Sequence, residues 1–291
     1  MMINTKVSPS PINNEEFWAK FEEYLLKNHN KQTTKDRIFY SKKYYDILTS
    51  SQTNAQELLL LSDQKRMHVM KALATLLKYL GCYDKWRDIK ERYQLKWSNG
   101  DSLETFNNMF INTDQNYSSM IEWLKDTCSK LCSSYGNILL FNTLTGLRPD
   151  EACKAIQIIQ KEEDNYIRRD LMILEHYKFP DIFIRRTKKA YFSVVTDSIL
   201  SLAKQSANCG YNALRLAVKR KKLDMKMAYC RKIFATYLRT HGIEQEIIDL
   251  LQGRSPKSVF ARHYFKPNFG KEKEKITVRL ENLYQQINIA S

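Results

Sequence analysis

The sequence predicts a mainly α-helical protein with a small antiparallel sheet, an α+β fold in two domains. Glycine and proline are scarce, with 8 and 6 among 291 residues, which argues against a loop-rich all-β sandwich. Apolar residues recur with helical spacing along most of the chain. Only one region, in the second half, has strand-like segments. With 43% hydrophobic residues, the chain can bury two modest cores.

The first half predicts a helical domain over residues 1–95. Helices are expected over residues 14–28, from an N-cap at Thr33 or Thr34, from Asn54, over 62–80 and over 84–95. Gly81 follows one of them as a C-terminal stop. Residues 96–115 are polar and weakly periodic, so we expect a linker there, and a second domain over 116–291.

The second half predicts helices on either side of a small sheet. Helices are expected over residues 118–133 and 137–145, and strands over 166–174, 181–186 and 190–195. Gly146 ends one helix, and Pro149 opens the next at its first helical position. The last two strands flank a Thr-Lys-Lys turn, which predicts a β-hairpin. After Thr196 the chain returns to helices, and residues 270–287 form a helical tail.

The charge of the chain indicates a polyanion as partner. Lysine and arginine number 47 against 32 acidic residues, a net charge of +15. One predicted helix ends in a basic cluster, which either contacts the phosphates of a polyanion or is a solvated helix end: Arg215, Lys219, Arg220, Lys221 and Lys222. No apolar run approaches a membrane span and no signal peptide is evident, so we expect a cytoplasmic, nucleoid-associated protein.

The six cysteines do not predict a metal site. Cys128 and Cys132 lie one helical turn apart, but no second pair and no nearby histidine completes a zinc site. The thiols are therefore interpreted as reduced packing residues, and no metal is expected.

Two segments place cations at turns. Arg148, in TGLRPDEA, is expected at the helix start between Gly146 and Pro149. A guanidinium beside free backbone N–H groups suits a phosphate, although an exposed surface arginine is the alternative. Lys188, in IFIRRTKKAYFSVV, is expected at the hairpin tip, where it either faces solvent or reaches a phosphate. Lys189 is the neighbouring alternative.

A third cation lies on an apolar stripe. Arg231, in AYCRKIFATYLRTHG, shares one helix face with Phe234, Ala235 and Leu238. A guanidinium there must be paired or must line a cleft, because burying it alone is costly. The alternative to a functional site is a structural ion pair.

The segment LLQGRSPKSVFARHYF combines a further arginine with a tyrosine. Arg254 follows Gly253 directly, just before a predicted short helix. Tyr264 falls at the end of that helix, four residues after Phe260, on which it would otherwise pack.

Together these segments resemble the catalytic domain of the tyrosine recombinases, and within them the integrases of archaeal spindle-shaped viruses and related plasmids. TGLRPDEA is similar to the first-arginine box, and RRTKKAYF to the hairpin lysine segment. AYCRKIFATYLRTHG resembles the second-arginine helix, and LLQGRSPKSVFARHYF the closing box with the nucleophile. The resemblance covers about residues 117–265, and the N-terminal half is more weakly similar to the helical core-binding domain that binds DNA in this family.

The resemblance implies an integrase that cleaves and rejoins DNA strands to insert or excise a viral or plasmid genome. It implies that Arg148, Arg231 and Arg254 clamp the scissile phosphate, and that Lys188 protonates the leaving oxygen. Tyr264 would be the nucleophile and form a 3′-phosphotyrosyl intermediate. Neither metal, ATP nor another cofactor is implied, and no small-molecule substrate. The implied partner is double-stranded DNA carrying attachment sites, bound by a homo-tetramer.

One departure from the family's pattern leaves two alternatives open. The family usually has histidine or lysine three residues before the second arginine, where this chain has Ala228, so Lys226 or Tyr229 would have to supply a proton. Arg254 stands near a position that is often histidine or tryptophan, in agreement with the archaeal subgroup. For the function of the whole protein, the alternatives to an integrase are a type IB topoisomerase-like strand transferase and a catalytically inactive DNA-binding relative.

Overall fold

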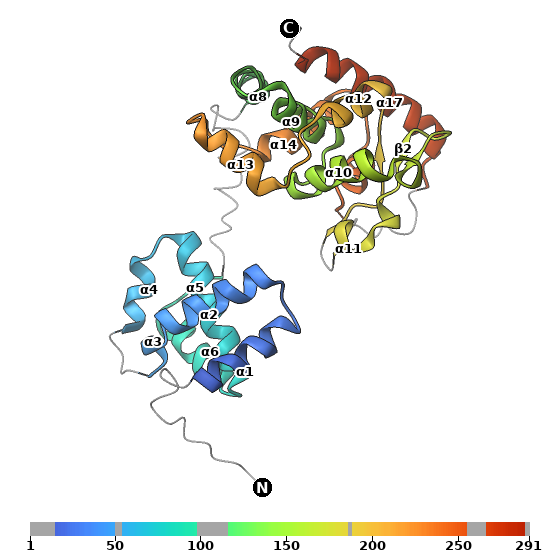
Figure 1. Ribbon diagram of the computed structural model, residues 1–291. Coiled ribbons are helices and arrows are strands. Elements are labelled where there is room, and N and C mark those ends of the chain that lie inside the picture. The colour runs from blue at the N-terminus through green and yellow to red at the C-terminus, as the bar shows by residue number, and fades with distance from the viewer. Residues whose placement is uncertain (1–14, 50–53, 98–115, 186–187, 255–265, 289–291) are drawn as a thin grey trace. The chain divides into compact units, whose positions relative to one another are not determined.

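The computed structural model describes residues 15–49, 54–97, 116–185, 188–254 and 266–288 (Figure 1). The chain divides into two compact units, residues 1–111 and 112–291, and each has its own hydrophobic core. Helices dominate both units and a small antiparallel sheet lies in the second, which confirms the predicted fold class. Most of the predicted linker, residues 98–115, lies outside the described residues.

The first unit is a bundle of helices around α5. Its elements are α1 (Glu15–Leu26), α2 (Lys31–Lys43), α3 (Asp46–Thr49), the 3-10 helix η1 (Asn54–Gln56), α4 (Glu57–Leu60), α5 (Asp63–Tyr79) and α6 (Tyr83–Arg92). Helix α5 packs against α1, α2 and α6 because its apolar side chains cover most of its circumference. Phe21, Met70, Leu73 and Trp86 are completely buried between these helices.

The start of α2 differs from the prediction. Its N-cap is Asn30, whose side-chain oxygen accepts a hydrogen bond from the N–H of Thr33 at 2.8 Å. The expected cap residue Thr34 is instead buried inside the helix. Asparagine caps a helix as well as threonine does, and here it stands earlier in the chain. The predicted stop at Gly81 is confirmed, since this residue has the left-handed φ of 71°.

The second unit is a helical layer packed on a small sheet. Its helices are α8 (Tyr117–Lys130), α9 (Ser133–Thr145), α10 (Pro149–Tyr166), η4 (His176–Lys178), α11 (Pro180–Phe183), α12 (Asp197–Gln205), α13 (Tyr211–Arg220), α14 (Ala228–Thr240), α15 (Gln245–Leu251) and α17 (Phe269–Ile287). Helix α9 is buried along almost its whole length and packs against α8, α10, α12, α14 and α17 (Figure 1). It therefore forms the centre on which the other helices are placed.

The strands are short and fall into two sheets. Strands β1 (Ile167–Arg168), β2 (Ile173–Leu174) and β5 (Ser193–Val194) pair in the antiparallel order β1–β2–β5. Strands β3 (Ile184–Arg185) and β4 (Lys188–Lys189) form a separate antiparallel hairpin.

The expected strand boundaries were partly wrong. Residues 166–174 do not form one strand but a tight hairpin, which turns at Met172 with φ 50°. Residues 181–183 belong to α11, because Pro180 starts a helical turn there. Lys188 is not in the turn but is the first residue of β4, opposite Arg185.

The base of the β3–β4 hairpin rests on a buried histidine. The ring of Phe183, which precedes β3, stacks on His176 with 4.3 Å between centroids. His176 also lies 2.6 Å from the hydroxyl of Tyr166 and 2.8 Å from that of Ser193. These contacts join the end of α10, the hairpin base and β5 in one buried cluster.

The C-terminal tail forms a helix, as predicted, and packs on its own unit. Ile276, Leu280, Leu283 and Ile287 recur on one face of α17 and are all buried. Their partners lie in α8, α9, α12 and α14. Glu281 accepts a hydrogen bond from the hydroxyl of Ser198 in α12 at 2.8 Å.

Candidate active site

Arg148 lies at the turn between α9 and α10, and this turn is pressed against α14. Gly146 ends α9 with φ 64°, and a Cβ atom there would lie 2.5 Å from the ring of Phe234 in α14. Arg148 is the N-cap residue of α10, followed by Pro149. The confirmed Gly146 stop and Pro149 start therefore bring Arg148 to the N-terminal end of a helix, where backbone N–H groups attract anions.

A buried carboxylate holds the side chain of Arg148. Nη1 of Arg148 lies 3.0 Å and 3.2 Å from the two carboxylate oxygens of Glu151, whose side chain is 1% exposed. The backbone N–H of Arg148 also donates to Glu151 at 3.2 Å. Sequence reasoning missed Glu151, although a glutamate three residues after a helix start is the usual signal of a capping box. Arg148 is only 19% exposed, so it is not a free surface arginine.

Arg231 extends from α14 into the same region. Its Nη2 atom donates to the carbonyl oxygen of Gln252 at 2.9 Å, and its buried Nη1 atom has no hydrogen-bond partner among the described residues. Burial, together with the positive charges of Arg148 and Arg254, lowers the pKa of Arg231 to about 10. The guanidinium is therefore still charged at neutral pH. Among the described residues Arg231 has no salt bridge within 4 Å, and the buried Glu151 carboxylate that pairs with Arg148 also favours the charged form of Arg231 and so raises its pKa.

Arg254 is held by the end of α15. The helix closes with hydrogen bonds from the N–H groups of Gly253 and Arg254 to the carbonyls of Leu250 and Asp249, at 3.0 Å and 2.8 Å. Gly253 adopts φ 67°, so this is a Schellman ending. The guanidinium of Arg254 is exposed and lies 3.1 Å from the Asp249 carboxylate.

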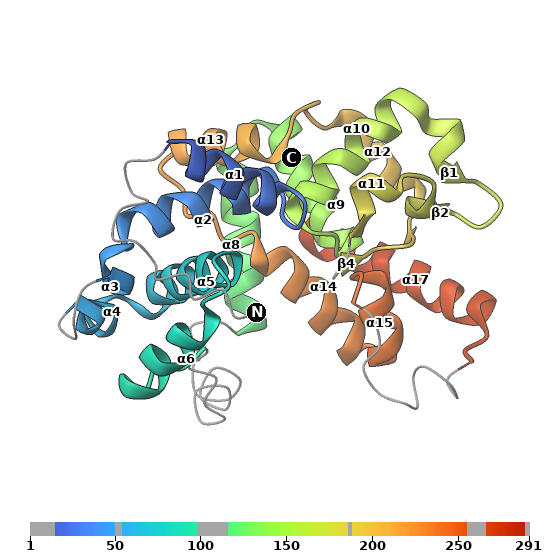
Figure 2. The same cartoon turned by 90° about the horizontal axis from the view of Figure 1, so that it is seen from below.

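The β3–β4 hairpin lies directly against this loop. The N–H of Lys189 donates to the carbonyl of Gly253 at 3.2 Å. A Cβ atom on Gly253 would lie only 2.7 Å from the backbone nitrogen of Ala190. The hairpin that carries Lys188 and Lys189 therefore lies beside α14, α15 and the loop before Arg254 (Figure 2). The Lys188 side chain and all of Tyr264 lie outside the described residues, so their roles stay predictions.

The two residues considered as replacements at Ala228 lie together. Lys226 is exposed, with its Nζ atom 5.7 Å from the centre of the Tyr229 ring. Tyr229 packs edge-on against Trp123 of α8, with 5.5 Å between ring centroids. Since 3.6 residues make a helical turn, Ala228 shares a face of α14 with Arg231 and Tyr229 does not. The structure thus gives no contact between Tyr229 and Arg231.

The basic cluster lies on the surface of the second unit. All five of its side chains are exposed, along α13 and just after it: Arg215, Lys219, Arg220, Lys221 and Lys222. Leu214 and Val218 bury the opposite face of α13. The amphipathic pattern of this helix therefore leaves its charge free to meet a polyanion.

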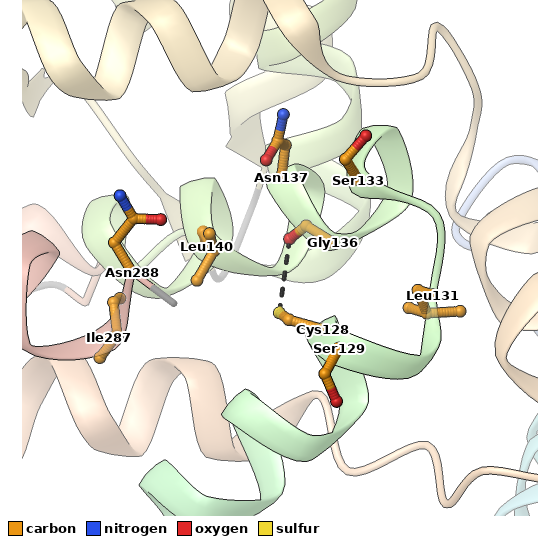
Figure 3. Close-up of a pocket in the computed structure, with 9 residues that line it drawn as sticks. All are labelled: Cys128, Ser129, Leu131, Ser133, Gly136, Asn137, Leu140, Ile287 and Asn288. Carbon is orange, nitrogen blue, oxygen red and sulfur yellow. Dashed lines mark hydrogen bonds between the residues drawn. The ribbon is translucent and has the colours of Figure 1, made fainter. Parts of the chain in front are cut away.

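Other features of the described residues lie apart from the arginines. A pocket of about 330 Å³ lies between α8, α9 and the end of α17, where Cys128 donates to the carbonyl of Gly136 (Figure 3). No charged residue lines it. Within the described ranges no group of histidine, cysteine and acidic side chains could hold a metal ion. All six cysteines are free thiols, and no described helix is long and apolar enough to cross a membrane.

Comparison with known proteins shows that the region of this site is similar to one family. Residues 138–275 match the family model of archaeal phage integrases. The matched segment runs from α9 into α17 and contains Arg148, Lys188, Arg231, Arg254 and Tyr264. A search of curated proteins found no match. Integrases of this kind are DNA recombinases, and DNA is their partner; over residues 138–275, just under half of its length, this chain is similar to the archaeal phage integrase family.

Proposed function

We propose that this protein is a site-specific tyrosine recombinase that integrates and excises a viral or plasmid genome. It cleaves and rejoins DNA strands through a 3′-phosphotyrosyl intermediate. The observation that carries this proposal is the convergence of three arginine-bearing segments. The turn that carries Arg148 is pressed against Phe234 of α14, the helix of Arg231, and Arg231 donates to the carbonyl of Gln252, two residues before Arg254. Arg148 and Arg254 each pair with one carboxylate, whereas Arg231 forms no salt bridge among the described residues, so the cluster keeps a net positive charge that suits an anionic substrate.

The arginines suit a scissile phosphate. Guanidiniums remain charged and match the geometry of phosphate oxygens, so Arg148, Arg231 and Arg254 can bind the two nonbridging oxygens. Arg231 has a buried N–H group with no partner among the described residues, and Arg148 is fixed by the Glu151 carboxylate. Because these donors are already oriented, they stabilise the charge that develops on the phosphorane without reorganising.

The covalent step needs a nucleophile and an acid. The Tyr264 oxygen attacks phosphorus, and the bond from phosphorus to the 5′-oxygen breaks. Lys188, or Lys189 as the alternative, gives its proton to that 5′-oxygen, which leaves as a hydroxyl. A tyrosine has an ordinary pKa of about 10, which cationic neighbours lower. The ester keeps the energy of the broken bond, so religation by the reverse reaction needs neither ATP nor a metal.

Duplex DNA is bound outside the reacting centre as well. In the second unit the exposed cations of α13 provide phosphate contacts, which supply affinity but no sequence information. We propose that the first unit is the core-binding domain. Its helix α2 carries exposed Lys31, Lys35, Lys42 and Lys43.

Recombination joins two duplexes, so we propose a homo-tetramer on the attachment sites and a location with the host chromosome in the cytoplasm. Crosslinking with and without attachment-site DNA measures the assembly. A DNA-dependent tetramer band supports it, whereas monomers alone on cleaved DNA contradict it.

A nicked suicide substrate tests the reaction. Release of a short 5′-hydroxyl fragment prevents religation, so the protein accumulates as a covalent adduct that is visible as a slower band on a denaturing gel. The wild-type protein is expected to form this adduct with EDTA present, and Tyr264→Phe to form none. An adduct retained by Tyr264→Phe would overturn the assignment of the nucleophile. Joined products from two duplexes, rather than relaxed supercoils alone, distinguish a recombinase from a topoisomerase.

One observation favours an inactive relative as the second candidate. Ala228 is the first residue of α14, and its methyl side chain provides no proton donor on the Arg231 face. An inactive protein would bind attachment-site DNA and leave even nicked strands without adduct. Replacing Ala228 by lysine or histidine, the residues usual in this family, is then expected to restore adduct formation, whereas in an active enzyme it only changes the cleavage rate.

A further inference from the structure

Gln252 and Arg231 are joined by two reciprocal hydrogen bonds. Nη2 of Arg231 donates to the backbone carbonyl of Gln252 at 2.9 Å. In return, the side-chain Nε2 of Gln252 donates to the backbone carbonyl of Arg231 at 2.8 Å. Gln252 is completely buried, so neither bond competes with water.

The hydrogen bond from the Gln252 side chain fixes the position of the end of α15, because the carbonyl that accepts it already has a partner within α14. The Arg231 carbonyl lies within α14, where it already faces the N–H group four residues on. The amide therefore contacts a carbonyl that has a helical partner, and its own Oε1 has no partner among the described residues. The Gln252 side-chain amide points Nε2, not Oε1, at the Arg231 carbonyl, because the reverse orientation would place Oε1 against the carbonyl oxygen. What the bond does is hold the end of α15 against α14.

This anchor determines where the Arg231 guanidinium points. The Gln252 carbonyl accepts the hydrogen bond from Nη2 of Arg231 only while the backbone of Gln252 stays in place. In this orientation Nη1 of Arg231 is buried and has no hydrogen-bond partner among the described residues. A buried N–H group without a partner is energetically unfavourable. A phosphate oxygen that reaches Nη1 would remove this cost.

The same short segment also positions two other parts of the site. The Gly253 carbonyl accepts a hydrogen bond from Lys189 in β4, and Arg254 follows immediately. Movement of Gln252 would thus disturb Arg231, the hairpin and Arg254 together.

We propose that Gln252 is a positioning residue for phosphoryl transfer, whose side-chain amide locks the Arg231 guanidinium in its phosphate-binding orientation. This role rests on the proposed recombinase function. Gln252 does not touch DNA; it acts through Arg231. Its loss therefore lowers the rate of cleavage at saturating DNA and leaves DNA affinity nearly unchanged.

The test compares Gln252→Met with a matched variant, Gln160→Met. Methionine keeps the length of glutamine but cannot donate a hydrogen bond. Gln160, in α10, likewise uses Nε2 to donate to two backbone carbonyls, those of Ala203 and Ser206, away from the arginines. Single-turnover adduct formation on the suicide substrate gives the rate, DNA titration gives the dissociation constant, and thermal unfolding gives the Tm.

Gln252→Met is expected to lose about 100-fold in rate, the effect of misplacing a catalytic group by about 1 Å, with DNA affinity within a few-fold. Gln160→Met is expected to keep the wild-type rate of cleavage even if its Tm falls by as much as that of Gln252→Met. A wild-type rate for folded Gln252→Met, or equal rate losses in the two variants, overturns the positioning role. If Gln252→Met does not fold, Gln252→Asn replaces it, with the same expected loss because its shorter neutral amide does not reach the Arg231 carbonyl.

A double-mutant cycle gives an independent readout. In an Arg231→Lys background the forked guanidinium is absent, so Gln252→Met should add less than about 3-fold to the loss. A full additional 100-fold loss there would show that Gln252 acts elsewhere, and it would refute the proposal. Absence of any adduct from the wild-type protein is a separate result, which removes the recombinase function and the positioning role with it.

Discussion

The backbone N–H of Lys189 donates to the carbonyl of Gly253 at 3.2 Å, so the β3–β4 hairpin is attached to the loop before Arg254. Gly253 makes this contact possible in two ways. It adopts a left-handed φ of 67°, and it lacks the Cβ that would lie 2.7 Å from the backbone nitrogen of Ala190. The position of the β3–β4 hairpin thus depends on the absence of a side chain at Gly253.

Replacing Gly253 by alanine is expected to impair cleavage more than stability alone explains. The added Cβ must push the hairpin backbone away, which misplaces Lys188 and costs about 100-fold in adduct formation. Gly242→Ala is the matched control, because Gly242 has φ 85° at the end of α14 and nothing lies within 4 Å of its added Cβ. Both variants strain the backbone by about 1–2 kcal/mol, so equal rates of cleavage in the two would contradict the prediction.

Arg148→Ala is expected to destabilise the protein as well as inactivate it. It removes the guanidinium that pairs with the buried Glu151 carboxylate, a change that typically costs about 3–5 kcal/mol. The double variant Arg148→Ala with Glu151→Gln leaves no unpaired carboxylate there and should regain part of this stability, yet form no adduct. Urea unfolding and the suicide substrate measure the two effects. Restored stability together with restored cleavage would show that Arg148 is only structural.

The stability of the protein should fall with acid because of His176. Burial lowers the pKa of His176 to about 3 from an ordinary 6.5. Between these pH values the unfolded chain binds a proton that the folded chain does not, so the free energy of unfolding falls as the pH decreases. The contribution is up to about 1.4 kcal/mol per pH unit. In His176→Gln this part of the slope from urea unfolding at several pH values should vanish, whereas exposed His241→Gln should keep it.

Neutralising α13 should weaken the salt dependence of DNA binding. Replacing Lys219, Arg220 and Lys221 by glutamine removes exposed cations, and each lost phosphate contact lowers the slope of log affinity against log salt by about 0.9. A control with the same loss of net charge replaces three lysines that already pair with carboxylates: Lys20, Lys130 and Lys275. If both triple variants change the slope equally, α13 is not a DNA contact surface.

Local features of the fold were predictable where neighbours in the chain suffice. Gly146 and Pro149 marked the turn that carries Arg148, because a left-handed stop and a proline start depend on single residues. Strand limits were less predictable. Lys188 lies in β4 and residues 181–183 in a helical turn, since such short strands are defined by pairing with distant backbone rather than by their own side chains.

The sequence by itself determined the mainly helical fold, the excess of positive charge and the order of the three arginines, the lysine and the tyrosine. Only the tertiary structure decided which groups hold Arg148 and Arg231. Glu151 on Arg148 and Gln252 on Arg231 became visible through buried hydrogen bonds. Helical periodicity in the sequence shows which face of a helix is buried. Hydrogen bonds between segments 21 residues apart, such as the one between Arg231 and Gln252, depend instead on how the helices pack against each other.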